Sequence, residues 1–200
     1  MMELKASQLI KLYMHTQIVI GYIYYAPTPE ARLLDALNGT SDLGPVKQGN
    51  FLELNNVIIN HGDGTEEKIQ KAYINKSTVQ LAATLGNADA GRGIGAQHGP
   101  KSYPFVEKLP VPVHVETETY VVTGNMYRVT LQKTWHVLED SPVFLPLTHA
   151  QVYSRSTEVC ERAPFLAVNK EHILSLQEEE KTALRKMSDA DIRRELKKVS

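Results

Sequence analysis

The chain contains an internal repeat, and this repeat constrains the fold more than any other feature. Three short blocks occur twice in the same order: residues 21–24, 51–54 and 74–76 return as residues 124–127, 144–147 and 168–170. The pairs read Gly-Tyr-Ile-Tyr and Gly-Asn-Met-Tyr, Phe-Leu-Glu-Leu and Phe-Leu-Pro-Leu, and Ile-Asn-Lys and Val-Asn-Lys. Their offsets of 103, 93 and 94 residues are nearly constant. Two copies of one small domain are the simplest explanation of this pattern.

The composition is that of a soluble globular protein, with 42% hydrophobic and 22% charged residues. A net charge of −1 provides no overall attraction for nucleic acid. Cys160 is the only cysteine, so neither an intrachain disulfide nor a zinc site made of several cysteines can form. No uncharged apolar run approaches the roughly 18 residues that a membrane helix needs. We therefore expect a cytoplasmic protein without a membrane partner.

The first copy, residues 1–85, predicts five strands and short helices. The strands are expected near residues 9–15, 17–26, 50–60, 68–76 and 78–85. A helix near residues 3–8 is expected ahead of them. A second helix at 29–38 has a capping threonine and a proline at its start, and an Asn-Gly pair at its end.

The second copy, residues 111–177, predicts five more strands. They are expected near residues 111–117, 119–131, 143–154, 165–170 and 171–176. Val111, Val113 and Val115 alternate with polar or proline positions, as in a half-buried strand. The glycine-rich stretch 86–110 predicts a flexible linker between the copies. In residues 178–200, apolar positions recur every three or four residues, which predicts an amphipathic helical tail.

Each copy resembles the Sm-like family of small barrels. In that family, a glycine in a bent second strand precedes an Asp-x-x-Met-Asn segment and an apolar strand. Gly21, residues 35–38 (Asp-Ala-Leu-Asn) and the first Phe-Leu block are similar and come in the same order. The family's second motif places Arg-Gly in a turn between two strands, and both copies have Asn-Lys there. The resemblance implies an all-β fold of two five-stranded Sm-like or SH3-like barrels in tandem.

The resemblance also implies candidate binding residues, because Sm proteins bind RNA through the asparagine of the first motif and the turn of the second. The matching residues here, for RNA or another ligand, are Asp35, Asn38, Asn75, Lys76, Asn169 and Lys170. The second copy has Trp-His-Val-Leu-Glu-Asp in place of the first motif, and the Arg-Gly pairs are absent.

Each candidate has a structural alternative. An Asn-Lys pair is a good tight turn, since asparagine tolerates the left-handed conformation. Asn38 suits the end of a helix, and Asp35 suits its solvent-exposed face.

No residue pattern predicts an enzyme, a metal site or a cofactor. The seven histidines lack the close spacing with a nearby acid that metal sites show. Cys160 and the serines lie outside the motifs of thiol and serine enzymes. The Gly-Arg-Gly-Ile-Gly run at 91–95 matches neither a phosphate-binding loop nor a complete dinucleotide fingerprint.

We therefore expect a non-catalytic scaffold or regulatory interaction module that self-assembles through its strand edges. Three two-barrel chains would then build a ring of six barrels, as a trimer. RNA binding is the alternative, with RNA in place of a protein partner. A small-molecule-binding barrel or an enzyme remains a third possibility.

Overall fold

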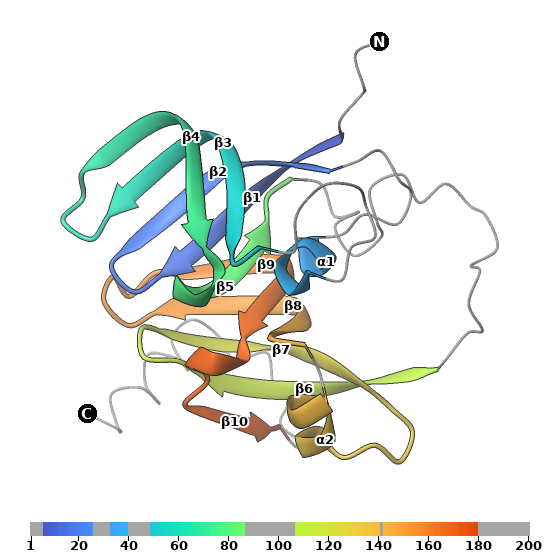
Figure 1. The fold of residues 1–200 in the computed structure, drawn as a ribbon. Helices are drawn as coiled ribbons and strands as arrows, with labels where there is room; N and C mark the ends of the chain where they lie inside the picture. Colours follow the sequence, from blue (N-terminus) through green and yellow to red (C-terminus); the bar gives the residue numbers. More distant parts are fainter. Residues whose placement is uncertain (1–5, 26–32, 40–48, 87–106, 141, 180–200) are drawn as a thin grey trace, which may run out of the picture.

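The computed structural model describes residues 6–25, 33–39, 49–86, 107–140 and 142–179. Two short helices and ten strands account for most of them (Figure 1). The first half contains β1 (Ala6–Met14), β2 (Gln17–Tyr25), α1 (Leu33–Asn38), β3 (Phe51–His61), β4 (Glu66–Asn75) and β5 (Val79–Thr84). The second half contains β6 (Lys108–Glu116), β7 (Tyr120–Val129), α2 (Thr134–Asp140), β8 (Phe144–Ser154), β9 (Cys160–Asn169) and β10 (Ser175–Glu178). The prediction of an all-β protein is confirmed.

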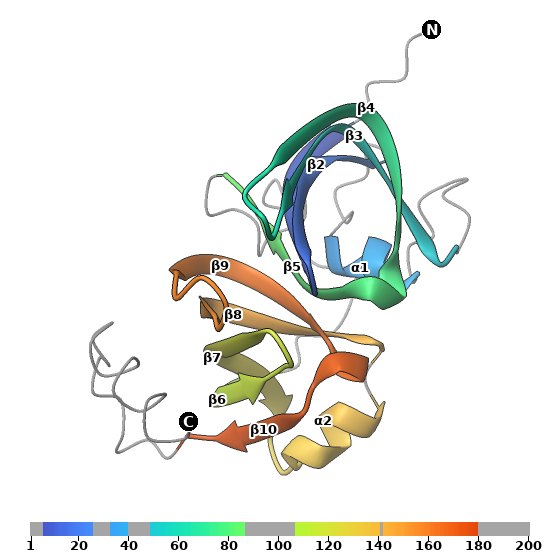
Figure 2. The same cartoon turned by 90° about the vertical axis from the view of Figure 1, so that its left-hand side faces the viewer.

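All ten strands belong to one antiparallel sheet, in the order β10-β6-β7-β8-β9-β5-β1-β2-β3-β4. Each half therefore orders its own five strands in the same way, with its fifth strand beside its first. The halves meet where β5 pairs with β9. Figure 2 shows the strands of the first half curling round, with α1 at one end of the curl, while α2 lies beside β10 in the second half.

The apolar residues form two cores, and each core takes side chains from both halves. The first core, around Leu12 and Leu54, also contains Phe144 and Phe165 of the second half. The second core, around Val113 and Leu147, also contains Tyr13 of the first half. This sharing follows from the β5–β9 pairing, because successive side chains of a strand point to opposite faces. Leu81 on β5 thus faces the second core, and its neighbour Ala82 faces the first.

The two repeated glycines lie at equivalent irregularities of the sheet. The pairing of β2 with β3 shifts register at Gly21, and that of β7 with β8 shifts at Gly124. Opposite them, Asn56 and His149 have positive φ angles of 50° and 52°. A Cβ on Gly21 would lie 3.2 Å from Val57 Cγ2. The expected role of Gly21 in a bent strand is thus explained by a bulge, where the extra residue increases the bend.

Several sequence expectations need correction. The second half contains α2, which was not predicted. Residues 6–8 begin β1 and are not helical, although a helix was expected near 3–8. Residues 108–110, assigned to the linker, begin β6, and residue 178, assigned to the tail, ends β10.

Other boundaries also differ. The predicted strands at 165–170 and 171–176 are β9, which begins at Cys160, and β10, with a 3-10 turn (Lys170–His172) between them. The helix predicted at 29–38 ends at Asn38 as expected, and its residues 29–32 lie outside the described part. The rest of the predicted linker (87–106) and of the tail (180–200) lies outside it too.

Candidate functional site

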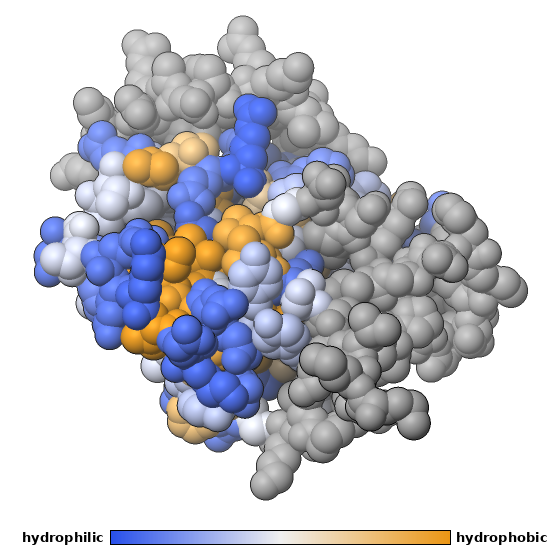
Figure 3. Space-filling view, turned by 90° about the horizontal axis from the view of Figure 1, so that it is seen from above, coloured by the Kyte–Doolittle hydropathy of each residue, from blue (hydrophilic) through white to orange (hydrophobic). Residues whose placement is uncertain are grey.

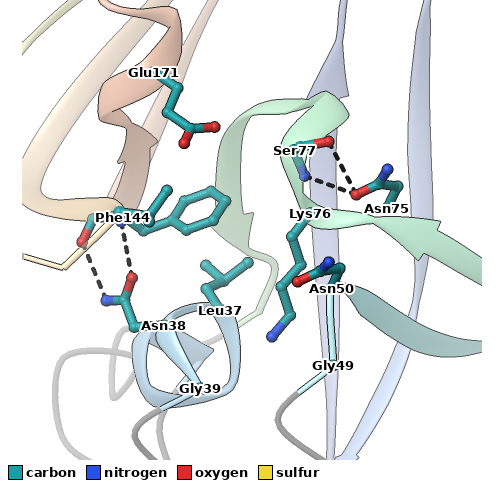
Figure 4. A pocket seen from close by; sticks show the side chains of 11 residues that line it. Leu37, Asn38, Gly39, Gly49, Asn50, Asn75, Lys76, Ser77, Phe144 and Glu171 are labelled. Atoms are coloured by element: carbon teal, nitrogen blue, oxygen red, sulfur yellow. Dashed lines mark hydrogen bonds between the residues drawn. The ribbon is translucent and has the colours of Figure 1, made fainter.

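A pocket of about 470 Å³ lies where the two halves meet (Figure 4). The first half contributes the end of α1, the start of β3 and the turn after β4. The second half contributes the start of β8 and the turn after β9. The lining residues are Leu37, Asn38, Gly39, Gly49, Asn50, Asn75, Lys76, Ser77, Val143, Phe144 and Glu171.

Asn38 fastens α1 to the second half. Its side-chain Nδ2 donates to the backbone oxygen of Phe144 (3.2 Å), and its Oδ1 accepts from the backbone N–H of Phe144 (2.8 Å). The side-chain amide of Asn38 thus contacts Phe144 as the backbone of a neighbouring antiparallel strand would, with one hydrogen bond donated and one accepted. Asn38 is the last residue of α1, and Gly39 follows with a φ of 67°, a conformation typical of helix ends. Its amide group therefore serves the contact between the halves.

Asn75 and Asn169 hold the turns that follow β4 and β9. Asn75 Oδ1 accepts from the backbone N–H of Ser77 (3.1 Å) and from its hydroxyl group (3.0 Å). Asn169 is fully buried, where Oδ1 accepts from Glu171 N–H (3.0 Å) and Nδ2 donates to Val79 O (3.0 Å). Each residue is the N-cap of a single 3-10 turn. A tight turn at Asn-Lys is therefore confirmed in both halves, but the left-handed conformation expected of the asparagines is wrong. Both are extended, with φ of −68° and −73°, and they hold the turn through their side chains.

The two lysines bind the helices of their own halves. Lys76 Nζ donates to Ala36 O in α1 (2.7 Å), and Lys170 Nζ donates to Leu138 O in α2 (2.6 Å). Carbonyl groups in the last turn of a helix lack partners within the helix, so a lysine is a favourable donor there. Burial lowers the pKa of Lys76 below its ordinary value.

The pocket brings three of the six predicted residues together, namely Asn38, Asn75 and Lys76. Asp35 lies half-buried in the first turn of α1 and does not line the pocket. Asn169 and Lys170 do not line it either.

Sequence reasoning missed all three lining residues of the second half, which are Val143, Phe144 and Glu171. Phe144 opens the second Phe-Leu block, and Glu171 follows the second Asn-Lys pair, so both stood beside recognised signals.

The pocket offers polar groups on an apolar base. Figure 4 shows the Glu171 carboxylate entering from the second half and Lys76 from the first, with the Phe144 ring between them. These are the two charged groups among the lining residues. Such a set can hydrogen-bond a small polar molecule.

A second polar arrangement joins the halves next to the β5–β9 pairing. Glu161 on β9 accepts two hydrogen bonds from Lys11 Nζ (2.7 and 2.6 Å) and one from Tyr13 OH (2.9 Å), both on β1. The Lys11 side chain is only 13% exposed. Burial, and then the negative charge of Glu161, raise the pKa of Tyr13 far above its ordinary value. In this partly buried ion pair, the Glu161 carboxylate is therefore matched by the Lys11 ammonium group.

Two further hydrogen-bonded groups cross the same boundary. The buried Gln80 on β5 accepts from the Thr117 hydroxyl (2.8 Å) and donates to the Thr119 hydroxyl (3.1 Å). Tyr120 OH donates to the backbone oxygen of Met14 (3.0 Å). Burial, and then the charge of Glu161, raise the pKa of Tyr120 to about 12. At the boundary between the halves, buried polar side chains such as Gln80 and Tyr120 thus have hydrogen-bond partners, as they do in a protein interior.

The sheet ends in two open edges. In the described residues, β4 pairs only with β3, and β10 pairs only with β6. Tyr73 on β4 is 62% exposed, and Leu174 just before β10 is 71% exposed. Figure 3 shows hydrophobic residues reaching the surface between hydrophilic ones on the face seen from above. Open strand edges are ready templates for pairing with another chain.

Within the described residues, no three His, Cys, Asp or Glu side chains are grouped closely enough to bind a metal ion. None of the helices there has the length and apolar character needed to cross a membrane. Comparisons with protein-family models, curated proteins and solved structures give no match to this chain.

Proposed function

We propose that this chain is a non-catalytic scaffold, built of two Sm-like five-stranded barrels in tandem, that assembles head to tail with copies of itself. The observation that carries the proposal is the β5–β9 junction. There, the fifth strand of one half pairs with the fourth strand of the other. The fourth strand of the first half, β4, and the fifth strand of the second half, β10, remain as the two open edges.

The internal junction supplies the expected register of the junction between copies. Leu81, Ala82 and Ala83 pair with Val168, Ala167 and Leu166. The pairings within each half make β5 equivalent to β10, and β9 equivalent to β4, with an offset of 94 residues. Ser175, Leu176 and Gln177 of one copy should therefore pair with Ile74, Tyr73 and Ala72 of the next.

An interface between two different edges is heterologous, so each added copy again presents the same pair of edges. Such contacts build a closed ring when the rotation closes and a filament when it does not. The resemblance to Sm-like rings of six or seven barrels favours closure with three chains. The exposed Tyr73 would then be covered by Leu176 of the neighbouring copy.

Light scattering on a sizing column tests the assembly. The wild-type chain should elute with a mass that is a multiple of its own 22.4 kDa. Tyr73→Lys should give monomers, because a charge at the centre of the paired segment would be buried without a partner. Tyr22→Lys is the matched control on the central strand β2, where the tyrosine is 37% exposed, and it should still assemble. A strictly monomeric wild-type chain refutes the proposal.

The pocket supports a second candidate function, RNA binding at the boundary of the halves, because it brings Asn38 of α1 together with Asn75 and Lys76 of the turn after β4. Purified protein should then carry nucleic acid and bind an oligouridine with an affinity that falls steeply with salt. Lys76→Gln should weaken that binding, and Lys68→Gln, at an exposed site on β4, should not. The absence of binding at low salt rejects this candidate.

A further inference from the structure

Strand β6, next to the open edge strand β10, carries a histidine where β1, next to β5 of the internal junction, carries a lysine. Ile10 and Val113 each pair with the bulge glycine of their half, so the next residues, Lys11 and His114, are equivalent. By the same register, Glu116 is equivalent to Tyr13. On the opposing strands, Phe51 pairs with Asn75 and Phe144 pairs with Asn169, and continuing this register makes Glu67 equivalent to Glu161.

The internal junction matches one carboxylate with one lysine. Lys11 donates two hydrogen bonds to Glu161, and Tyr13 donates a third. The junction between copies would instead place His114 and Glu116 against Glu67 of the next copy. Arg155 already pairs with Glu116 (3.0 Å), so the register leaves the imidazole of His114 opposite the Glu67 carboxylate, in the place that Lys11 takes opposite Glu161.

The charged groups around this site are few. His114 Nε2 lies 3.5 Å from Glu116 Oε1, and Arg155 donates to Glu116 Oε2 (3.0 Å). His114 pairs with Thr123 on β7 and with Gln177 on β10, and both of these residues are uncharged. Glu179 comes two residues after Gln177 in the sequence.

One histidine and two charged side chains flank Glu67 on the other edge. His61 lies 3.7 Å from the Glu67 carboxylate, and Glu66 is paired with Lys68 (2.9 Å). His61 lies beside Glu67 in the separate chain already, whereas the register brings His114 to Glu67 only when two copies meet.

We propose that protonation of His114 controls the junction between copies, so that assembly strengthens as the pH falls from about 8 to about 6, the range in which imidazole ordinarily titrates. This inference rests on the proposed head-to-tail assembly. Assembly adds the Glu67 carboxylate of the next copy beside His114, so the assembled state holds the proton more tightly than the separate chain does. By linkage, assembly is therefore favoured at low pH and is lost as the pH rises.

The test measures the dissociation constant of the assembly by sedimentation at about pH 6, 7 and 8, at constant salt and with EDTA present to exclude metal bridging. One proton taken up per junction changes this constant by at most about tenfold per pH unit. His114→Lys restores the cation of the internal junction, so it should assemble tightly at every pH. His114→Gln should assemble weakly at every pH. His61→Gln, beside Glu67, should keep the wild-type pH dependence.

The outcomes separate the two proposals. Wild-type assembly that is independent of pH, or a pH dependence that survives in His114→Gln, overturns the role of His114 and leaves the scaffold proposal intact. If neither the wild-type chain nor His114→Lys assembles at any of the three pH values, the head-to-tail assembly itself is wrong. A pH dependence that is lost in both His114 variants and kept in His61→Gln supports the inference.

Discussion

Replacing Asn38 by alanine should loosen the contact between the two halves. The substitution removes two hydrogen bonds, of 3.2 and 2.8 Å, to the backbone of Phe144. The Phe144 residue is only 1% exposed, so water cannot readily replace the lost partner groups. Each bond of this kind contributes about 0.5–1.5 kcal/mol to stability. The free energy of unfolding of Asn38→Ala should therefore fall by about 1–3 kcal/mol.

Urea denaturation followed by tyrosine fluorescence and by circular dichroism measures this change. With a slope of about 2 kcal/mol per molar, the midpoint should move down by roughly 1 M and the slope should stay the same. Asn50→Ala is the matched control, because Asn50 lines the same pocket with an exposed side chain. Its stability should remain within about 0.5 kcal/mol of the wild type. If the two variants unfold at the same midpoint, Asn38 does not fasten the halves.

Two further changes test the sheet and the boundary. Gly21→Val should lower the free energy of unfolding by about 1–3 kcal/mol, because its Cβ would lie 3.2 Å from Val57 Cγ2; thermal unfolding checks this, and an unchanged midpoint contradicts the tight contact. Tyr120, whose pKa is raised to about 12, keeps its proton in the folded chain after the unfolded chain loses it near pH 10. Stability from this group is thus complete below about pH 10 and is lost as the pH rises toward 12. Urea midpoints at pH 9 and 11 should show a smaller loss in Tyr120→Phe than in the wild type.

The strands could be predicted because their signal is local. Alternating apolar residues and the repeated Phe-Leu blocks placed β3 and β8 within one residue of their observed starts. Such blocks must face a core wherever the strand pairs, so no knowledge of the partner strand is needed. Gly21 and Gly124 were identified because they are repeated in the sequence, but the bulges at these positions were not predicted.

Helix α2 could not be predicted from periodicity. Its seven residues make fewer than two turns, and a 3.6-residue period needs a longer segment to appear. The repeat itself carried the information, because α1 lies between the same two blocks in the first half. Lys170, whose side chain binds Leu138 O in α2, occupies the place that Lys76 occupies relative to α1.

The pocket could not be predicted from the sequence, because it depends on which strands of the two halves pair. Asn38 and Phe144 are 106 residues apart and come together only when β5 pairs with β9. The sequence of β5 does not specify this partner, since the four apolar residues among its six buried ones would suit any apolar neighbour. Besides Asn38, two predicted residues line the pocket, Asn75 and Lys76. They were predicted from the turn motif, without any indication that a pocket lies there.

The charges on β4 allow two explanations, which the internal junction separates. Charged residues on an edge strand commonly prevent pairing with other chains. On β4 they lie between Glu66 and Lys71, whereas the segment expected to pair, residues 72–74, is uncharged. Strand β9 has the same division, with Glu161 and Arg162 at one end and the paired residues 166–168 at the other. Because β9 pairs with β5 despite its charged end, the charges on β4 are compatible with pairing, and the uncharged segment beside them favours it.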